Sequence, residues 1–93
     1  MSADYISRIN RAIREATHGE LPAELSEGHS LVFDLGFDSL AMARLGLTLE
    51  DQFGVPILLD SWMSSQSDPS ALTVGSLRAF VESRLEADER AAP

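Results

Sequence analysis

The sequence predicts an all-α fold, a bundle of three long helices and one short helix with a long first connection. Three observations support this prediction. Apolar residues recur at the spacing of an amphipathic helix in separate stretches, and no segment alternates apolar and polar residues for long enough to form a strand. The chain has 93 residues, which is the length of one domain. We therefore expect residues 1–93 to form a single helical domain.

The first part of the chain is predicted to hold one helix and one long connection. The helix spans residues 4–17, with Ser2 suited to cap its start and His18-Gly19 suited to end it. Residues 18–37 form a connection longer than most loops, and long ordered loops are often functional. The helix stripe consists of Ile6, Ile9, Ile13 and Ala16, and the residues expected to hold the connection against the core are Leu21, Leu25, Leu31, Phe33 and Leu35.

A second helix is predicted over residues 39–53. Asp38 is a good cap because its carboxylate can accept from the unpaired amides of the first turn, and Gly54 allows a left-handed exit. Gly46 inside the helix costs about 1 kcal/mol relative to alanine, so it needs a reason such as close helix packing or room for a bound group. The broad apolar face consists of Leu40, Met42, Ala43, Leu45, Leu47, Leu49 and Phe53.

Two further helices complete the bundle. A short helix is expected over residues 58–65, and a loop that turns at Asp68-Pro69 follows it. The last helix is expected over residues 73–86 with Thr73 as its cap, and residues 87–93 are expected to form a flexible tail. The stripe of the last helix consists of Val74, Leu77, Val81 and Leu85.

The composition excludes several classes of function. The net charge is −8, from 15 acidic residues against seven arginines and no lysine, which disfavours binding to nucleic acid. The chain has no cysteine for a disulfide, a thiol nucleophile or a metal site. It has no apolar run of about 20 residues and no signal peptide, so we expect a cytoplasmic protein without a membrane span. The acidic surface either attracts basic partners or only aids solubility, and charge alone does not separate the two.

The stretch from Asp34 to Leu40 carries the functional prediction. Gly36 permits a tight approach before the helix, and Ser39 stands at the helix N-terminus, where amides point outward and the macrodipole is positive. A phosphate bonded to Ser39 would lie where helix ends favour anions, and Asp38 can help hold Mg²⁺ for a transferase that delivers the group. The pattern therefore suits a serine that receives a phosphodiester, and not one that attacks a substrate.

The residues from Leu31 to Ile57 resemble the recognition helix and preceding loop of the acyl carrier protein family. That family has an Asp-Ser-Leu that opens a helix ending in a Leu-Glu…Phe-Gly pattern, and this chain has Asp38-Ser39-Leu40, Leu49-Glu50 and Phe53-Gly54. The resemblance covers residues 4–86. It implies a non-enzymatic four-helix carrier with 4′-phosphopantetheine on Ser39, flanked by Asp38 and Leu40, and acyl groups held as thioesters on the thiol of that arm.

The resemblance also implies partners and two sets of residues. A phosphopantetheinyl transferase would modify Ser39, an acyl-activating enzyme or acyltransferase would load the arm, and a downstream synthase or condensation enzyme would unload the monomeric carrier. The implied partner contacts are Asp38, Leu40, Arg44, Glu50 and Asp51. The candidate acyl-pocket residues are Met42, Gly46, Leu49, Leu59, Trp62 and Leu77, and for each of these ordinary core packing is the alternative.

Two departures from the family pattern concern the pathway. Carriers of primary fatty-acid synthesis are strongly acidic in the early turns of the serine helix, whereas this chain has Ala41 and Arg44 there. The segment 58–73, which contains Trp62, is also longer than in those carriers. Both departures suggest a specialised bacterial pathway such as polyketide or lipopeptide biosynthesis.

Three other functions stand as alternatives. Aminoacyl or peptidyl carriers of nonribosomal peptide synthesis typically have Gly-Gly-His-Ser or Gly-Gly-Asp-Ser around the serine, and Phe37-Asp38 favours the acyl class instead. An acidic helical adaptor that is never modified would not need Ser39. A serine hydrolase with His29 as its base would need a Gly-x-Ser-x-Gly elbow, which the residues around Ser39 do not form. The two histidines and scattered acids do not match a metal site.

Overall fold

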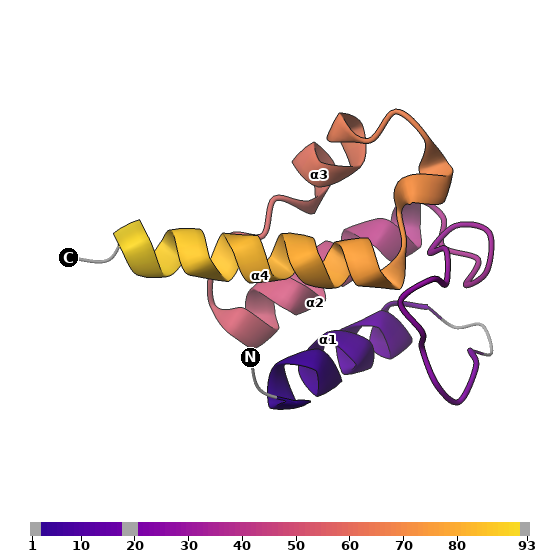
Figure 1. Ribbon diagram of the computed structural model, residues 1–93, viewed down its shortest axis with the longest axis horizontal. Coiled ribbons are helices and arrows are strands. Elements are labelled where there is room, and N and C mark those ends of the chain that lie inside the picture. The colour runs from indigo at the N-terminus through magenta and orange to yellow at the C-terminus, as the bar shows by residue number, and fades with distance from the viewer. Residues whose placement is uncertain (1–2, 18–20, 92–93) are drawn as a thin grey trace.

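A computed structural model describes residues 3–17 and 21–91, and these residues form helices and connections without a strand (Figure 1). The helices are α1 (Ala3–Ala16), α2 (Ser39–Phe53), α3 (Leu59–Ser65) and α4 (Val74–Ala91), with a 3₁₀ turn, η1 (Pro69–Ala71), before α4. Within this part of the chain, one isolated antiparallel bridge pairs Ser30 with Thr73. The predicted all-α bundle with a long first connection is confirmed.

The observed helix ends differ from the predicted ones mainly at the end of α4. The bounds of α2 are as predicted, and both ends of α1 and the starts of α3 and α4 are shifted by one residue. The last helix was predicted to end at residue 86, but α4 continues to Ala91. Residues 87–91 consist mainly of strong helix formers and contain no glycine or proline. The predicted cap Ser2 and the predicted stop His18-Gly19 lie outside the described residues.

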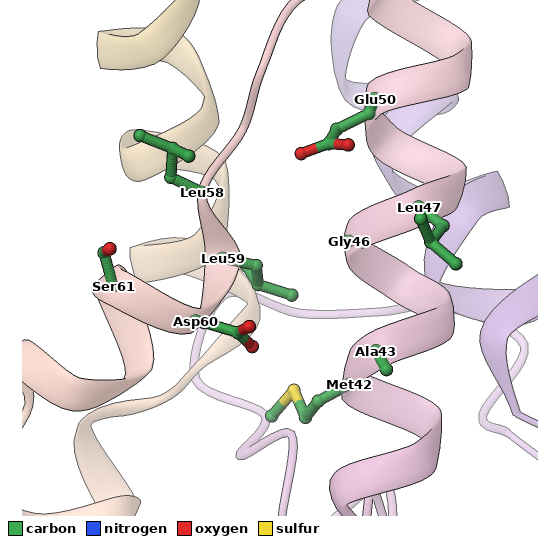
Figure 2. A pocket seen from close by; sticks show the side chains of 9 residues that line it. All are labelled: Met42, Ala43, Gly46, Leu47, Glu50, Leu58, Leu59, Asp60 and Ser61. Carbon is green, nitrogen blue, oxygen red and sulfur yellow. The ribbon is translucent and has the colours of Figure 1, made fainter.

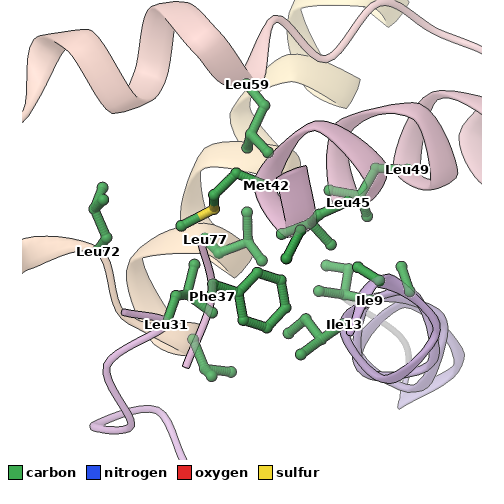
Figure 3. Close-up of a cluster of buried hydrophobic side chains, with 14 of the residues drawn as sticks. Ile9, Ile13, Leu31, Phe37, Met42, Leu45, Leu49, Leu59, Leu72 and Leu77 are labelled. Atoms are coloured by element: carbon green, nitrogen blue, oxygen red, sulfur yellow. The ribbon is translucent and has the colours of Figure 1, made fainter. Parts of the chain in front are cut away.

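All four helices and the connection between α1 and α2 contribute to one core. α1 and α2 pack side by side and run in opposite directions (Figure 1). Phe37 of the connection lies between Ile13 of α1 and Leu77 of α4 (Figure 3). The largest fully buried side chains are Ile9, Ile13, Leu31, Leu45, Leu49, Ile57, Val74, Leu77 and Val81. None of the helices in the described part of the chain combines the length and apolar character that a bilayer crossing requires.

Some residues assigned to apolar faces are exposed. Ile6 of α1 is 38% exposed, and Leu40 and Leu47 of α2 are 59% and 69% exposed. Phe33 was expected to hold the first connection against the core and is instead 68% exposed, whereas Leu31 is fully buried. The helical spacing of apolar residues predicted a wider buried face on α2 than the structure shows. Neighbouring elements bury only Ala41, Met42, Leu45 and Leu49 of this helix.

Arg14, Arg78 and Arg84 donate to backbone carbonyls of the connections, and Arg8 donates to the Gln52 carbonyl in the last turn of α2. A carbonyl in a loop has no helical partner, and a guanidinium offers five N–H donors in one plane. The pairs are Arg8 with Gln52, Arg14 with Pro22 (2.9 Å) and Ala23 (2.7 Å), Arg78 with Leu25 (3.3 Å) and Arg84 with Pro56 (3.3 Å). Arginines of α1 and α4 therefore fix the chain before and after α2.

Backbone hydrogen bonds also join the first connection to the start of α4. They are Val74 N to His29 O (2.9 Å), Gly75 N to Glu27 O (3.0 Å) and Leu31 N to Leu72 O (2.8 Å). The first amides of a helix have no partner inside the helix, so the connection satisfies two of them in α4. This approach requires Gly75, because a Cβ there would lie 2.9 Å from the Glu27 Cβ and 3.1 Å from the Glu27 carbonyl oxygen.

We expect Gly75→Ala to lower the free energy of unfolding by about 1–2 kcal/mol, because strain against Glu27 exceeds the gain in helix propensity. Urea denaturation followed by circular dichroism measures the change. The matched control is Gly28→Ala, on the same connection, where an added Cβ meets no atom within 4 Å. Its free energy of unfolding should stay within about 0.5 kcal/mol of the wild-type value, and equal losses in both variants would contradict this explanation.

Tyr5 of α1 carries a buried hydroxyl at the far end of α2 from Ser39. The Tyr5 ring lies 5.5 Å from the ring of Phe53, the last residue of α2. Its hydroxyl has no hydrogen-bond partner among the described residues. Burial, and after it the carboxylates of Glu82 and Glu86, raise the pKa of Tyr5 to about 12. The folded state therefore favours the protonated phenol.

The stabilisation from protonated Tyr5 should be complete below its unfolded pKa of 10 and be lost as the pH rises to about 12. The chain has no lysine, no cysteine and no second tyrosine, so no other side chain is expected to ionise in this window. The thermal midpoint should fall across the window, and Tyr5→Phe should remove most of the fall. Phenolate absorbance at 295 nm follows the titration, and an ionisation near pH 10 in the folded protein would contradict the burial argument.

Candidate functional site

The N-terminus of α2 holds Ser39 at the surface. Asp38 precedes it in an extended conformation (φ −108°, ψ −174°), and its Oδ1 accepts from the amide of Ala41 at 2.8 Å. Ser39 is the first residue of α2 and is exposed. The prediction that Asp38 caps this helix is confirmed. Ser39 therefore lies where the amides of the first helical turn favour a negatively charged group.

A closed turn, residues 30–37, leads into the capped helix. Its hydrogen bonds are Ser30 N to Asp34 Oδ2 (2.7 Å), Phe33 N to Ser30 Oγ (3.0 Å), Asp34 N and Leu35 N to Ser30 O (3.0 Å each) and Phe37 N to Leu31 O (2.8 Å). Gly36 has a left-handed backbone conformation (φ +72°), which glycine adopts without a steric penalty. The turn therefore fixes the direction in which the chain reaches Asp38 and Ser39.

The site has the chemical features that a phosphodiester on Ser39 needs. A second protein can reach the exposed Ser39, and a phosphate there would lie at the positive end of α2. The helix cap uses Oδ1 of Asp38, which leaves Oδ2 for a divalent cation brought by a transferase. This chain has no cysteine and therefore no thiol of its own. A phosphopantetheine arm, when bound, supplies the thiol on which a thioester can form.

A cavity of about 490 Å³ lies between α2 and α3 (Figure 2). Three predicted acyl-pocket residues, Met42, Gly46 and Leu59, line it. The remaining lining residues were not predicted for a pocket and are Ala43, Leu47, Glu50, Leu58, Asp60 and Ser61. The walls are therefore largely apolar, with two carboxylates among them.

The other three predicted pocket residues do not line this cavity. Leu49 and Leu77 are fully buried, and Trp62 is 6% exposed. The Trp62 ring stacks on Phe80 of α4, with ring centroids 5.4 Å apart. Core packing, which was the alternative for these residues, accounts for where they lie.

Gly46 and Leu58 shape the cavity from opposite sides. A Cβ on Gly46 would lie 3.4 Å from the Leu59 Cβ, so the glycine permits α3 to approach α2. Leu58 precedes α3 in a left-handed conformation (φ +59°, ψ +48°), which costs a residue with a Cβ roughly 1–2 kcal/mol. No signal in the sequence marked Leu58, because leucine is not typical of this conformation.

The predicted partner-contact residues lie on α2 or form its cap. Leu40 and Asp51 are exposed. Arg44 is half-buried and lines a second hollow of about 390 Å³, together with Asp38 and Leu40. Glu50 has an internal role that the sequence did not reveal, because its Oε2 accepts from the amide of Ile57 at 3.2 Å and holds the chain that follows α2.

His29 does not act on Ser39 in this arrangement. Its Nδ1 accepts from the amide of Ser26 at 3.1 Å and lies 3.3 Å from the Ser26 Oγ. Across residues 3–17 and 21–91, no hydrogen bond joins His29 to Ser39, and no group of three acidic or histidine side chains could hold a metal ion. The hydrolase alternative therefore has no geometric support.

An exposed serine at a capped helix end, in a small all-α bundle, is the arrangement expected for a carrier of a covalently attached group. Residues 7–73, more than two thirds of the chain, match the family described as Phosphopantetheine attachment site. The chain belongs to the acyl carrier protein family, whose members are carriers and not enzymes. Its cofactor is 4′-phosphopantetheine.

Bacterial acyl carrier proteins are similar to this chain over most of its length. The acyl carrier protein of Rhodococcus erythropolis is 31% identical over 86 residues, which cover 91% of this chain and 85% of the relative. The meromycolate extension acyl carrier protein of Mycobacterium tuberculosis is 33% identical over 90 residues, which cover 96% of this chain and 71% of the relative. The acyl carrier protein of Sinorhizobium fredii is 36% identical over 81 residues, which cover 86% of this chain and 94% of the relative. No solved structure gives a significant match.

Proposed function

We propose that Ser39 carries the phosphopantetheine arm and that residues 1–93 act as one carrier domain. The observation that carries the proposal is the exposed Ser39 at the first position of the capped helix α2. Asp38 assists Mg²⁺ binding while the arm is attached, and Leu40 flanks the attachment point. The acyl group is then held as a thioester on the thiol of the arm.

The carrier works with three kinds of enzyme in the cytoplasm. A phosphopantetheinyl transferase attaches the arm, an acyl-activating enzyme or acyltransferase loads it, and a synthase or condensation enzyme unloads it. As a monomer, the protein presents α2 to these partners. The contact residues on α2 and its cap are Asp38, Leu40, Arg44, Glu50 and Asp51. The relatives are named acyl carriers, which supports an acyl cargo over an aminoacyl one.

The pathway is a specialised bacterial one, such as polyketide or lipopeptide biosynthesis. The support comes from α2, which has no acidic residue before Glu50 and carries Ala41 and Arg44 in its early turns. Enzymes whose binding surface is complementary to an evenly acidic helix would not match this charge pattern. The pattern therefore suits a different set of partner enzymes. One relative is itself named for meromycolate extension.

The cavity between α2 and α3 shelters the acyl chain. Its volume of about 490 Å³ lies within the range of roughly 300–1,000 Å³ that is usual for small-molecule sites. Met42, Gly46 and Leu59 contact the chain in this proposal. Leu49, Trp62 and Leu77 are buried and do not line this cavity.

We expect the purified chain to gain the mass of one phosphopantetheine when incubated with coenzyme A, Mg²⁺ and a promiscuous phosphopantetheinyl transferase. Intact-protein mass spectrometry measures the gain. Ser39→Ala should show no gain, because it removes the only oxygen proposed to accept the phosphate. Its thermal midpoint should stay close to that of the unmodified wild type, because Asp38 still caps α2.

A folded wild-type chain that gains no mass with several transferases would contradict the carrier proposal and favour an unmodified adaptor. A mass gain in Ser39→Ala would instead show that the arm is attached to another residue. Released ester product in the absence of a second protein would support the hydrolase alternative.

We expect Gly46→Val to remove most of the thermal stabilisation that an octanoyl group gives the loaded protein. The new side chain projects from α2 next to Leu59, where it occupies space proposed for the acyl chain. Differential scanning calorimetry compares the octanoyl form with the form that carries a free thiol. The control is Ala79→Val on an exposed position of α4, which should keep the full stabilisation. Equal stabilisation in both variants would contradict the proposed shelter.

A further inference from the structure

Phe33 is exposed although three other large apolar residues of the closed turn are buried. Its side chain is 68% exposed, whereas Leu31, Leu35 and Phe37 are 0%, 5% and 4% exposed. The exposure does not come from a loose loop, because the amide of Phe33 donates to Ser30 Oγ at 3.0 Å inside the closed turn. A large aromatic side chain that an ordered turn holds in solvent is available for contact with another protein.

The exposed ring lies close to the proposed attachment point. Phe33 and Ser39 are six positions apart in the chain, and even an extended chain of that length spans at most about 22 Å. The hydrogen bond from Phe37 N to Leu31 O (2.8 Å) folds this stretch back on itself, which makes the separation shorter. A protein that contacts Ser39 therefore lies within reach of Phe33.

The charges near Phe33 indicate the chemistry of the partner. Asp34 directly follows Phe33, Asp38 precedes Ser39, and both are exposed. No arginine or lysine occurs between Glu15 and Ala43. An aromatic ring with carboxylates beside it is complementary to an apolar recess that carries arginine or lysine at its rim.

We propose that Phe33 is a docking anchor for the phosphopantetheinyl transferase, which receives the ring in an apolar recess with a basic rim. This inference rests on the proposed attachment of the arm to Ser39. The transferase must bring coenzyme A to the Ser39 oxygen itself, whereas enzymes that act on the thioester work at the far end of the arm. Because the turn is already ordered, docking loses little conformational entropy, and aromatic anchors of this kind dominate many interfaces.

The test measures kcat/KM for modification of the unmodified protein by a promiscuous phosphopantetheinyl transferase, with coenzyme A at saturation. Phe33→Ala should lower kcat/KM at least tenfold, mainly through KM, and Phe33→Tyr should retain it within threefold because the ring is kept. Phe33→Arg should be slower than Phe33→Glu, since the arginine would face the basic rim. The control Ile6→Ala changes another exposed apolar residue, next to Tyr5 at the far end of α2, and should stay within twofold.

The outcomes distinguish this inference from the proposed function. A wild-type protein that is modified while Phe33→Ala stays within twofold would overturn the anchor and leave the attachment at Ser39 intact. Equal kcat/KM values for Phe33→Arg and Phe33→Glu would contradict the proposed basic rim on the transferase. A wild-type protein that is never modified would refute the attachment at Ser39, and the anchor with it. Thermal midpoints close to the wild-type value in all variants would exclude misfolding as the cause of any loss.

Discussion

The contact between the first connection and the start of α4 determines where the rest of the molecule lies. A segment without helical hydrogen bonds needs partners for its peptide groups, and the first turn of a helix needs acceptors for its amides. Both needs are met where Val74 and Gly75 donate to His29 and Glu27. From that fixed point the chain enters the closed turn, residues 30–37, and reaches Asp38 in the conformation that caps α2. The position of Ser39 therefore depends on a backbone contact with the last helix as well as on its own helix.

The two faces of α2 have different roles in this arrangement. One face packs into the core through Ala41, Met42, Leu45 and Leu49, and α2 contacts α1 more extensively than it contacts α3. On the side of α3, Gly46 lies next to Leu59 and borders the cavity. The left-handed conformation of Leu58 introduces strain where α3 begins, and strain of this kind is found where a structure is shaped for a ligand.

The sequence was sufficient for the features that local chemistry dictates. The Asp38 cap, the bounds of α2 and the exit at Gly54 follow from capping preferences and from the conformational freedom of glycine. It was not sufficient for features that depend on which surfaces meet. The spacing rule assigned Leu40 and Leu47 to an apolar face, but no element covers them, and Gly75 had no recognisable role until Glu27 was seen beside it. Which of the predicted pocket residues line the cavity (Met42, Gly46 and Leu59) and which are buried without lining it (Leu49, Trp62 and Leu77) likewise depends on where α3 lies.

The arginine–carbonyl pairs give the molecule tethers that do not involve its carboxylates. Ion pairs between side chains weaken when salt screens them or when acid protonates the carboxylate. A guanidinium keeps its proton below about pH 12, and a backbone carbonyl does not titrate at all. These arginine–carbonyl contacts therefore persist while salt screens the acidic surface, and they act beside the contacts that Asp34, Asp38 and Glu50 make through their carboxylates. Changes in ionic strength can therefore alter the attraction of a protein with a net charge of −8 to basic partners while these arginine–carbonyl tethers remain in place.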